Sequence, residues 1–257
     1  MRLSVEVMRN MALAVLLSPT LALARDLVPS GLTVKATTSA VNVATDLAPL
    51  PSLPLNAQPR RANFLNTIPS SDARRVADWV VDSADNAGLP FVIIDKIRAT
   101  VLVFDKQGKL RGATLALLGR ARGDNSVPGI GRKKLSAILP NERTTPAGRF
   151  VASLGVDFEH DVLWIDYATS LSLHRVVTGN PGDHRLQRLA TISTLDKRIS
   201  YGCVNVPVNF YEDVVLTTFA HTSGIVYILP EVKTIQEVFA IGKNTHDIDR
   251  NSVLTNR

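Results

Sequence analysis

The 257-residue chain has very little cysteine, since Cys203 is the only one. A single thiol cannot form an internal disulfide, and His160, His221 and His246 lack zinc-ligand spacing to it and to one another. Phosphate-binding glycine loops are missing as well: Gly129-Ile130-Gly131 does not continue as a dinucleotide fingerprint, and no Gly-Lys-Ser/Thr ending occurs. The sequence therefore predicts no metal site and no cofactor, and it does not support nucleotide chemistry.

Long hydrophobic runs are also scarce. Residues 11–24 are almost wholly apolar, follow Arg2 and Arg9, and end on the small residues that signal peptidase requires. The run is shorter than the roughly 20 residues that span a bilayer, and no later segment approaches that length. Residues 1–24 are predicted to be a cleavable secretory signal, with an uncleaved anchor as the alternative. We expect an exported protein of the periplasm or cell envelope, without a transmembrane segment after cleavage.

Basic residues exceed acidic ones, giving a net charge of +6 and a pI of about 9.7. This balance favours an anionic partner such as nucleic acid, a membrane surface or an acidic polymer, without choosing among them. The proline-rich residues 25–69 are predicted to be a linker. Residues 70–90 are predicted to be an N-terminal helical segment, whose helix Ser70 or Ser71 caps and which runs to about Asn86. Residues 91–230 are predicted to form the main domain, and residues 231–257 a polar C-terminal tail.

The main domain has the pattern of short strands. The turn Asp105-Lys106-Gln107-Gly108 predicts a hairpin, and apolar or β-branched runs predict strands at 91–94, 100–104, 109–118, 149–154, 162–167, 170–177 and 224–229. Pro207 and the apolar residues after it have the spacing of a helix. Because strands and helices do not alternate regularly, we expect a mainly β fold with flanking helices rather than a doubly wound sheet.

Cys203 is the strongest candidate for a functional residue. An unpaired thiol in an oxidising compartment is a liability unless it is used, although free cysteine is often a small buried hydrophobe. A nucleophilic thiol needs a base, and His174 at the end of a predicted strand is the best placed of the histidines. His184, in the polar loop 179–194, is the alternative base.

The segment Ser200-Tyr201-Gly202-Cys203-Val204-Asn205 resembles the signature of the L,D-transpeptidase (YkuD-type) catalytic domain, Ser/Thr-His-Gly-Cys-hydrophobic-Asn/Arg. Thr145-Pro146-Ala147-Gly148-Arg149-Phe150 resembles the start of another strand of that family, and Leu173-His174 its strand-end histidine. The residues that follow the cysteine resemble the family's helix and last strand. The resemblance covers about residues 91–230 and implies an L,D-transpeptidase-like twisted β-sandwich or barrel.

The resemblance also implies an activity and a set of site residues. Such enzymes attack peptidoglycan stem peptides through a cysteine, release D-alanine, and pass the acyl group to an amine. Cys203 would be the nucleophile, His174 the proton acceptor, and the backbone carbonyl of Arg175 the group that orients the imidazole. The remaining implied roles are an oxyanion hole formed by the N–H groups of Gly202 and Cys203, and substrate binding by Ser200, Tyr201, Asn205 and Arg188. The expected partner is the stem peptide, not nucleic acid.

Two departures from the family pattern leave alternatives open. Tyr201 replaces the usual histidine of the signature, and Cys203 follows His174 by 29 residues where the family has a little under twenty. The difference implies an insertion, most simply residues 179–194, which is either a lid whose arginines pair with substrate carboxylates or a solvated loop. Besides a transpeptidase, the sequence allows a hydrolytic L,D-carboxypeptidase or amidase of the same fold, and a non-catalytic wall- or glycan-binding domain. It does not reveal the acyl acceptor or the oligomeric state.

Overall fold

The structure is a computed structural model that describes residues 58–157, 159–239 and 241. The predicted signal and most of the predicted linker lie outside the described residues. Residues 58–69, the end of that linker, have almost no regular structure but pack on the folded body: Phe64 is buried, and Asn63 forms a β-bridge with Lys109. Among the described residues, no helix is both long and apolar enough to cross a membrane.

The body is built on an eight-stranded mixed sheet in the order β3-β2-β1-β10-β5-β6-β7-β9. Most neighbours are antiparallel, whereas β1 with β10 and β7 with β9 are parallel. The strands are β1 (Phe91–Asp95), β2 (Thr100–Phe104), β3 (Leu110–Leu115), β5 (Gly148–Asp157), β6 (His160–Asp166), β7 (Leu171–Arg175), β9 (Val204–Val206) and β10 (Gly224–Ile228). A separate parallel pair joins β4 (Leu118–Gly119) to β8 (Arg198–Ser200).

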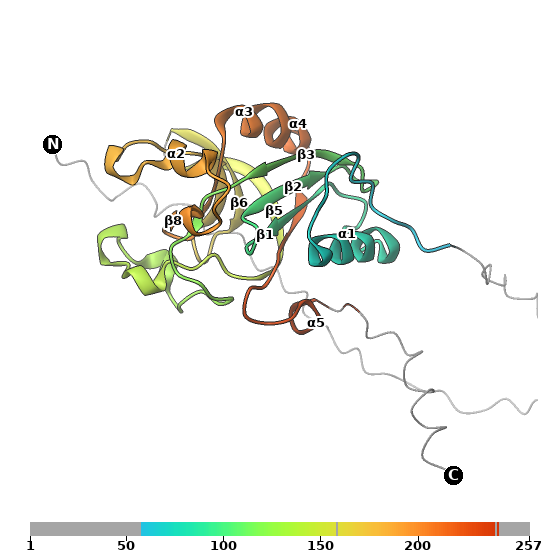
Figure 1. Cartoon of the computed structure of the whole chain (residues 1–257), viewed down its shortest axis with the longest axis horizontal. Coiled ribbons are helices and arrows are strands. Elements are labelled where there is room, and N and C mark those ends of the chain that lie inside the picture. The colour runs from blue at the N-terminus through green and yellow to red at the C-terminus, as the bar shows by residue number, and fades with distance from the viewer. Residues whose placement is uncertain (1–57, 158, 240, 242–257) are drawn as a thin grey trace, which may run out of the picture. The chain divides into compact units, whose positions relative to one another are not determined.

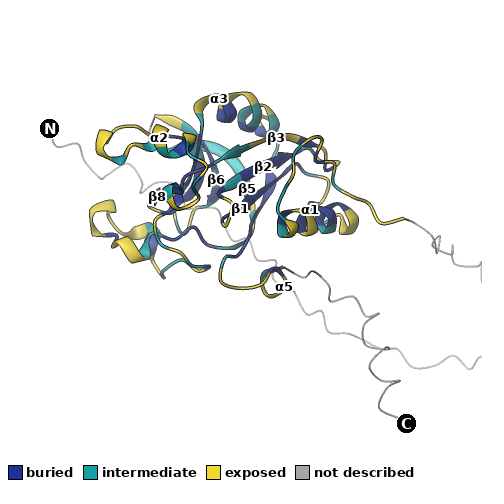
Figure 2. Ribbon diagram, viewed as in Figure 1, coloured by how far each residue is buried: buried dark blue, intermediate teal, exposed yellow. Residues whose placement is uncertain are grey.

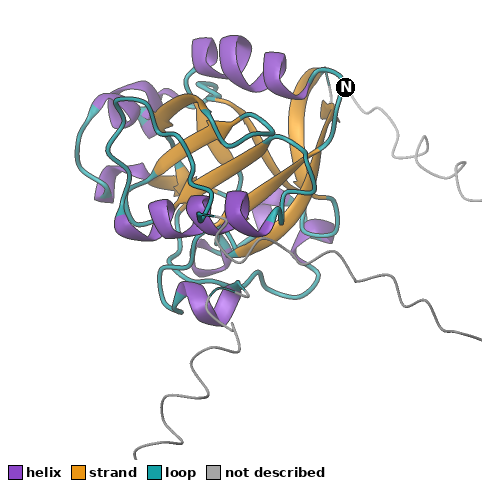
Figure 3. Ribbon diagram, turned by 90° about the vertical axis from the view of Figure 1, so that its right-hand side faces the viewer, coloured by secondary structure: helices purple, strands orange, loops and turns teal. Residues whose placement is uncertain are grey.

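The sheet curves until its two edges nearly meet. Leu117, which follows β3 at one edge, exchanges two backbone hydrogen bonds with Asn205 in β9 at the other edge. Figure 3 shows the strongly curved sheet with helices on its outside. The expected mainly β, barrel-like fold with flanking helices is confirmed.

Strand β1 is buried on both faces, which explains its uninterrupted apolar sequence. Val92 and Ile94 face the inside of the curved sheet, whereas Phe91 and Ile93 face α1 (Ser71–Ser83). Ser70 caps α1 by accepting a hydrogen bond from the Ala73 N–H, as expected. The helix ends at Ser83, slightly before the predicted end near Asn86, because Ala84 adopts a left-handed conformation. A short helix, α5 (Ile235–Val238), lies in the predicted tail.

The helical segment after the cysteine contains a π-helical turn. It runs through α3 (Val208–Phe210), the π-helix Tyr211–Leu216 and α4 (Thr217–Phe219). A π-helical turn holds more residues than an α-turn, so it shifts which side chains face the sheet. Phe210 is buried, whereas Val208, which the α-helical spacing places on the apolar face, is 44% exposed.

Two largely exposed segments project from the body on either side of β8 (Figures 1 and 2). We call residues 120–143 the basic loop; it holds the 3₁₀ turns Ile130–Arg132, Leu135–Ala137 and Pro140–Glu142. We call residues 179–194 the insertion; it holds the 3₁₀ turn Pro181–Asp183 and the helix α2 (Arg185–Ala190). The 3₁₀ turn Leu195–Lys197 connects the insertion to β8.

Candidate active site

Parallel pairing of β7 with β9 brings the conspicuous residues of the sequence together. Leu173 pairs with Val204, and His174 pairs with Asn205. Cys203 lies in the bend between β8 and β9, one residue before this ladder begins. The pairing therefore joins His174 and the cysteine segment although 29 residues separate them in the chain.

The Cys203 thiol is held by groups at the start of β7. Its S–H donates to the Ser170 carbonyl oxygen at 3.4 Å, and the buried Ser172 hydroxyl donates to Sγ at 3.6 Å. Burial raises the pKa of the Cys203 thiol, and the hydrogen bond from Ser172 opposes this rise. The neutral thiol is therefore favoured in the resting site.

The His174 imidazole is fixed at both ring nitrogens. Nδ1 lies 2.6 Å from the Arg175 carbonyl oxygen, and Nε2 lies 3.4 Å from Nδ2 of Asn205. Burial lowers the pKa of His174, and the nearby charge of Arg185 acts in the same direction. The Arg175 side chain forms ion pairs with Asp161 on one side and Glu212 on the other, which anchors the residue whose carbonyl orients the ring.

Cys203 and His174 line one cavity of about 510 Å³. The insertion contributes Arg185 to its wall, and the basic loop contributes Ile130, Gly131, Lys133, Leu135 and Ile138. The other lining residues are Asp157, Trp164, Thr169, Ser170, Ser200, Tyr201 and Asn205. Within the described residues, Sγ and the imidazole do not hydrogen-bond directly. Because such bonds are often long or absent without substrate, the arrangement remains compatible with a nucleophile and its base.

Gly202 gives the cysteine segment its shape. Its φ of +135° is one that residues with a side chain rarely adopt, and a Cβ there would lie only 3.0 Å from the Thr144 carbonyl oxygen. The Gly202 N–H donates to the Ser200 hydroxyl at 3.1 Å, and this hydroxyl donates to the Cys203 carbonyl oxygen at 2.6 Å. Of the two N–H groups predicted to form the oxyanion hole, that of Gly202 is thus engaged. The Cys203 N–H has no other residue as a hydrogen-bond partner in the described part of the chain.

Thr145 connects the cysteine segment to the body. Its buried hydroxyl donates to the Gly202 carbonyl oxygen at 2.6 Å and accepts from the Gly119 N–H at 2.9 Å. Its own carbonyl oxygen accepts from Nζ of Lys96 at 3.0 Å. Lys96 belongs to a set of buried charged residues that we call the ion cluster, formed by Lys96, Asp124, Arg198 and Glu231.

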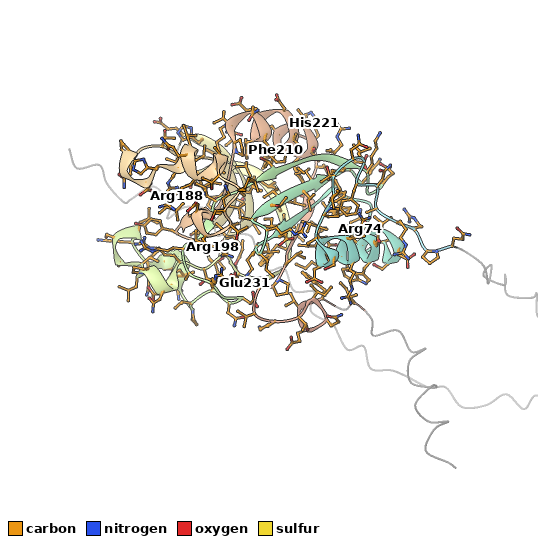
Figure 4. All side chains as sticks on the ribbon, in the orientation of Figure 1. Arg74, Arg188, Arg198, Phe210, His221 and Glu231 are labelled. Atoms are coloured by element: carbon orange, nitrogen blue, oxygen red, sulfur yellow. The ribbon has the colours of Figure 1, made fainter. Side chains whose placement is uncertain are left out.

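The other predicted site residues lie in different surroundings. The Tyr201 ring lies under the Arg143 guanidinium, 3.8 Å from its carbon, and lines the cavity. Arg188, labelled in Figure 4, does not line the cavity: its guanidinium donates to the carbonyl oxygens of Asp183 and Asp196. The alternative base His184 is exposed and is not among the lining residues either. The structure thus brings Arg185, rather than Arg188, to the predicted site.

Sequence reasoning missed several groups of this site. Ser172 could have been found, because it precedes His174 by two residues and therefore lies on the same face of the strand. Thr145 belongs to a recognisable sequence motif, but the motif does not predict its contact to Gly202. Arg185 carried no local signal that distinguished it from Arg188. Among the described residues, no three histidine, cysteine or acidic side chains are grouped closely enough to hold a metal ion.

No family model matches the chain, and no curated protein sequence matches it. Several solved structures are similar. The helical cell shape determining protein Pgp2 from Campylobacter jejuni is 14% identical with a TM-score of 0.37, over 57% of this chain and 49% of that one. The L,D-transpeptidase from Xylanimonas cellulosilytica is 17% identical with a TM-score of 0.32, over 55% of this chain and 60% of that one.

The catalytic domain of an L,D-transpeptidase from E. faecium is 15% identical with a TM-score of 0.34, over 54% of this chain and 95% of that domain. This chain spans only about half to three fifths of the length of the first two structures. Similarities of this strength do not establish an activity, which must be inferred from the residues of the site.

Proposed function

We propose that this protein is an exported cysteine L,D-transpeptidase that acts on peptidoglycan stem peptides. The observation that supports the proposal best is the constellation around Cys203. A lone thiol and a histidine line one cavity, and Nδ1 of that histidine lies 2.6 Å from the carbonyl oxygen of the next residue, Arg175. This is the orienting contact that the family resemblance implies for the base.

In the proposed reaction, His174 Nε2 takes the proton of the Cys203 thiol, and the sulfur attacks the carbonyl carbon that precedes the terminal D-alanine of the stem peptide. The tetrahedral oxyanion collapses to a thioester when the C–N bond breaks, and the imidazolium returns the proton to the leaving amine. An amine of a second stem peptide then attacks the thioester, His174 accepts its proton, and the thiol is regenerated as the cross-link forms.

The resting site favours an uncharged pair. Burial raises the pKa of the Cys203 thiol and lowers the pKa of the His174 imidazole, so both act against a preformed thiolate and imidazolium. We therefore place the proton transfer after substrate binding, when the S–H turns from the Ser170 carbonyl oxygen toward Nε2. Without substrate, the thiol should react slowly with alkylating reagents at neutral pH.

The test is to incubate the purified protein with muropeptides that carry tetrapeptide stems and to analyse the products by mass spectrometry. We expect D-alanine release with cross-linked dimers, and a covalent adduct of Cys203 with a carbapenem. Cys203→Ala and His174→Ala should abolish the products. His221→Ala is the matched control, because His221 is exposed and does not line the cavity (labelled in Figure 4).

Each other outcome has a defined meaning. Tripeptide monomers without dimers would show that water is the acceptor and would replace the transferase by a hydrolase of the same site. Unchanged muropeptides together with no carbapenem adduct would overturn catalysis by Cys203. Activity that survives in His174→Ala but not in His184→Ala would move the base to His184. Export is tested separately, by fusing residues 1–24 to a reporter that is active only outside the cytoplasm.

A further inference from the structure

Arg185 is the cation that the insertion directs toward the proposed base. It is the first residue of α2, and its side chain is 14% exposed. Its Nε donates to Asp183 at 2.9 Å, and its Nη1 donates to Oδ1 of Asn205 at 2.9 Å. Because Asn205 lies beside His174 in the β7–β9 ladder, this contact links the insertion to the imidazole.

The contact determines how the Asn205 amide is oriented. A guanidinium has only hydrogen-bond donors, so the Asn205 atom that faces Arg185 must be the oxygen. The NH₂ group must then face the opposite way, where it lies 3.3 Å from the Cys203 carbonyl oxygen and 3.4 Å from His174 Nε2. A carbonyl oxygen only accepts, so the Cys203 carbonyl supports the same orientation.

The amide orientation in turn determines the proton position on His174. An NH₂ group donates, so Nε2 must accept and carries a lone pair. The proton of the neutral imidazole is therefore on Nδ1, where it can be donated to the Arg175 carbonyl oxygen at 2.6 Å. A general base that takes a proton from Cys203 through Nε2 needs this tautomer.

We propose that Arg185 is a positioning residue for His174, which acts through Asn205 to keep an unprotonated Nε2 at the cavity. This proposal rests on the function proposed above. It makes the insertion part of the site, since the residue that keeps the base competent comes from residues 179–194. Arg185 does not touch the thiol, so we do not call it catalytic.

Charged side chains from several elements surround His174. Arg185 approaches from the insertion, and Asp157 at the end of β5 lines the same cavity and opposes its effect. His160, Asp161 and Arg175 line a neighbouring cavity together with His174, and the Arg175 guanidinium there is paired with Asp161 and Glu212. Removing the Arg185 charge should make protonation of the imidazole easier.

The experiment measures the His174 tautomer and titration by two-bond ¹H–¹⁵N correlation spectra of the imidazole rings, with His174→Ala to identify the His174 signals. Arg185→Gln replaces a group that only donates by one that also accepts, so residue 185 no longer restricts the Asn205 amide, which is then oriented by the Cys203 carbonyl oxygen alone. Arg185→Lys keeps a cation that only donates. Lys134→Gln is the matched control for loss of one charge, because Lys134 is exposed and does not line the cavity.

We expect the Nδ1–H tautomer in the wild type, in Arg185→Lys and in Lys134→Gln. In Arg185→Gln, the Nε2–H tautomer should appear, the pKa of His174 should rise, and acylation of Cys203 by a carbapenem should slow by about tenfold. A wild-type Nε2–H tautomer overturns the proposal, and so does an Arg185→Gln spectrum with the wild-type tautomer and titration.

A second variant is used if Arg185→Gln does not fold. In Asn205→Asp the carboxylate cannot donate a hydrogen bond, so Nε2 should become protonated and the pKa of His174 should rise. A wild-type spectrum of Asn205→Asp would overturn the proposal. The spectra need no peptidoglycan, so they also separate the two proposals. A protein with the expected tautomers that leaves muropeptides unchanged would refute the proposed function alone.

Discussion

The two exposed segments beside Cys203 are attached to the body in different ways. The basic loop is fixed at its start by the ion cluster, where Asp124 accepts hydrogen bonds from Lys96 and from three backbone N–H groups of residues 231–233. The insertion is fixed by the buried Lys197, which donates to the carbonyl oxygens of Arg188, Leu189 and Thr191 at the end of α2 and contacts no carboxylate among the described residues.

The two attachments support different residues of the candidate site. The ion cluster supports Thr145, which hydrogen-bonds the backbone of Gly202 beside the thiol, so it helps to hold Cys203, the proposed nucleophile, in place. The insertion contacts a side chain, Asn205, next to His174, the proposed base, and we propose above that this contact sets the protonation of the imidazole. We expect damage to the first attachment to cost global stability, and damage to the second to be local.

The largest expected effect follows from breaking the ion cluster. In Lys96→Met, Asp124 would be left buried without a cationic partner, whereas Glu231 would keep Arg198, and such a loss costs about 3–5 kcal/mol of the free energy of unfolding. Urea unfolding followed by tryptophan fluorescence measures this cost. Lys106→Met is the control, because Lys106 is an exposed lysine, and it should change the stability little. Equal effects of the two substitutions would refute a stabilising role of the ion cluster.

Acid should weaken the same attachment by a smaller amount. Burial alone would raise the pKa of Asp124, but the hydrogen bonds from Lys96 and the backbone outweigh it and lower the pKa from 3.8 to about 2. A carboxyl with a lowered pKa stabilises the fold above pH 4, and this contribution of about 2 kcal/mol disappears as the pH falls from 4 to 2. The stability of Asp124→Asn, starting from a lower value, should depend less on pH over this range. Parallel curves for the two proteins would contradict the prediction.

The smallest expected change in stability concerns the insertion. Lys197→Met removes the hydrogen-bond donor of the last carbonyl groups of α2, but it leaves no carboxylate without a cationic partner. Because this segment is largely exposed, water can donate to these carbonyl groups instead. We expect a loss of about 1 kcal/mol in global stability. Local opening should nevertheless increase, so trypsin should cleave after Arg185 or Arg188 faster than in the wild type. Equal losses of stability in Lys197→Met and Lys96→Met would contradict the expected difference between the two attachments.

The sequence predicted the elements whose pattern is local. The apolar runs of β1 and β2, the turn before β3 and the Ser70 cap all depend on neighbouring residues, and they were placed nearly where the structure has them. Strands β8 and β9 were not predicted, because each has only three residues and forms through partners far away in the chain. The π-helical turn was missed for a similar reason: its residues also fit an α-helical pattern.

The candidate site was predictable at the level of its motifs. The sequence placed Cys203, His174 and the Arg175 carbonyl in one site, and their roles remain a prediction. It could not foresee that the Gly202 N–H is occupied by Ser200, or that Arg185 rather than Arg188 reaches the cavity. Both depend on which direction a side chain or N–H takes after the chain has folded, and composition and spacing do not contain that information.

The pairing of β7 with β9 allows the segment that connects these strands to vary in length. The ladder, not the connecting segment, sets the distance between His174 and the cysteine segment. The segment between His174 and Cys203 only has to join the two strands, and the entropic cost of closing it grows with the logarithm of its length. A connection of 29 residues costs only about 0.4 kcal/mol more to close than one of about 19. New side chains can therefore be introduced beside His174 at almost no cost in folding free energy.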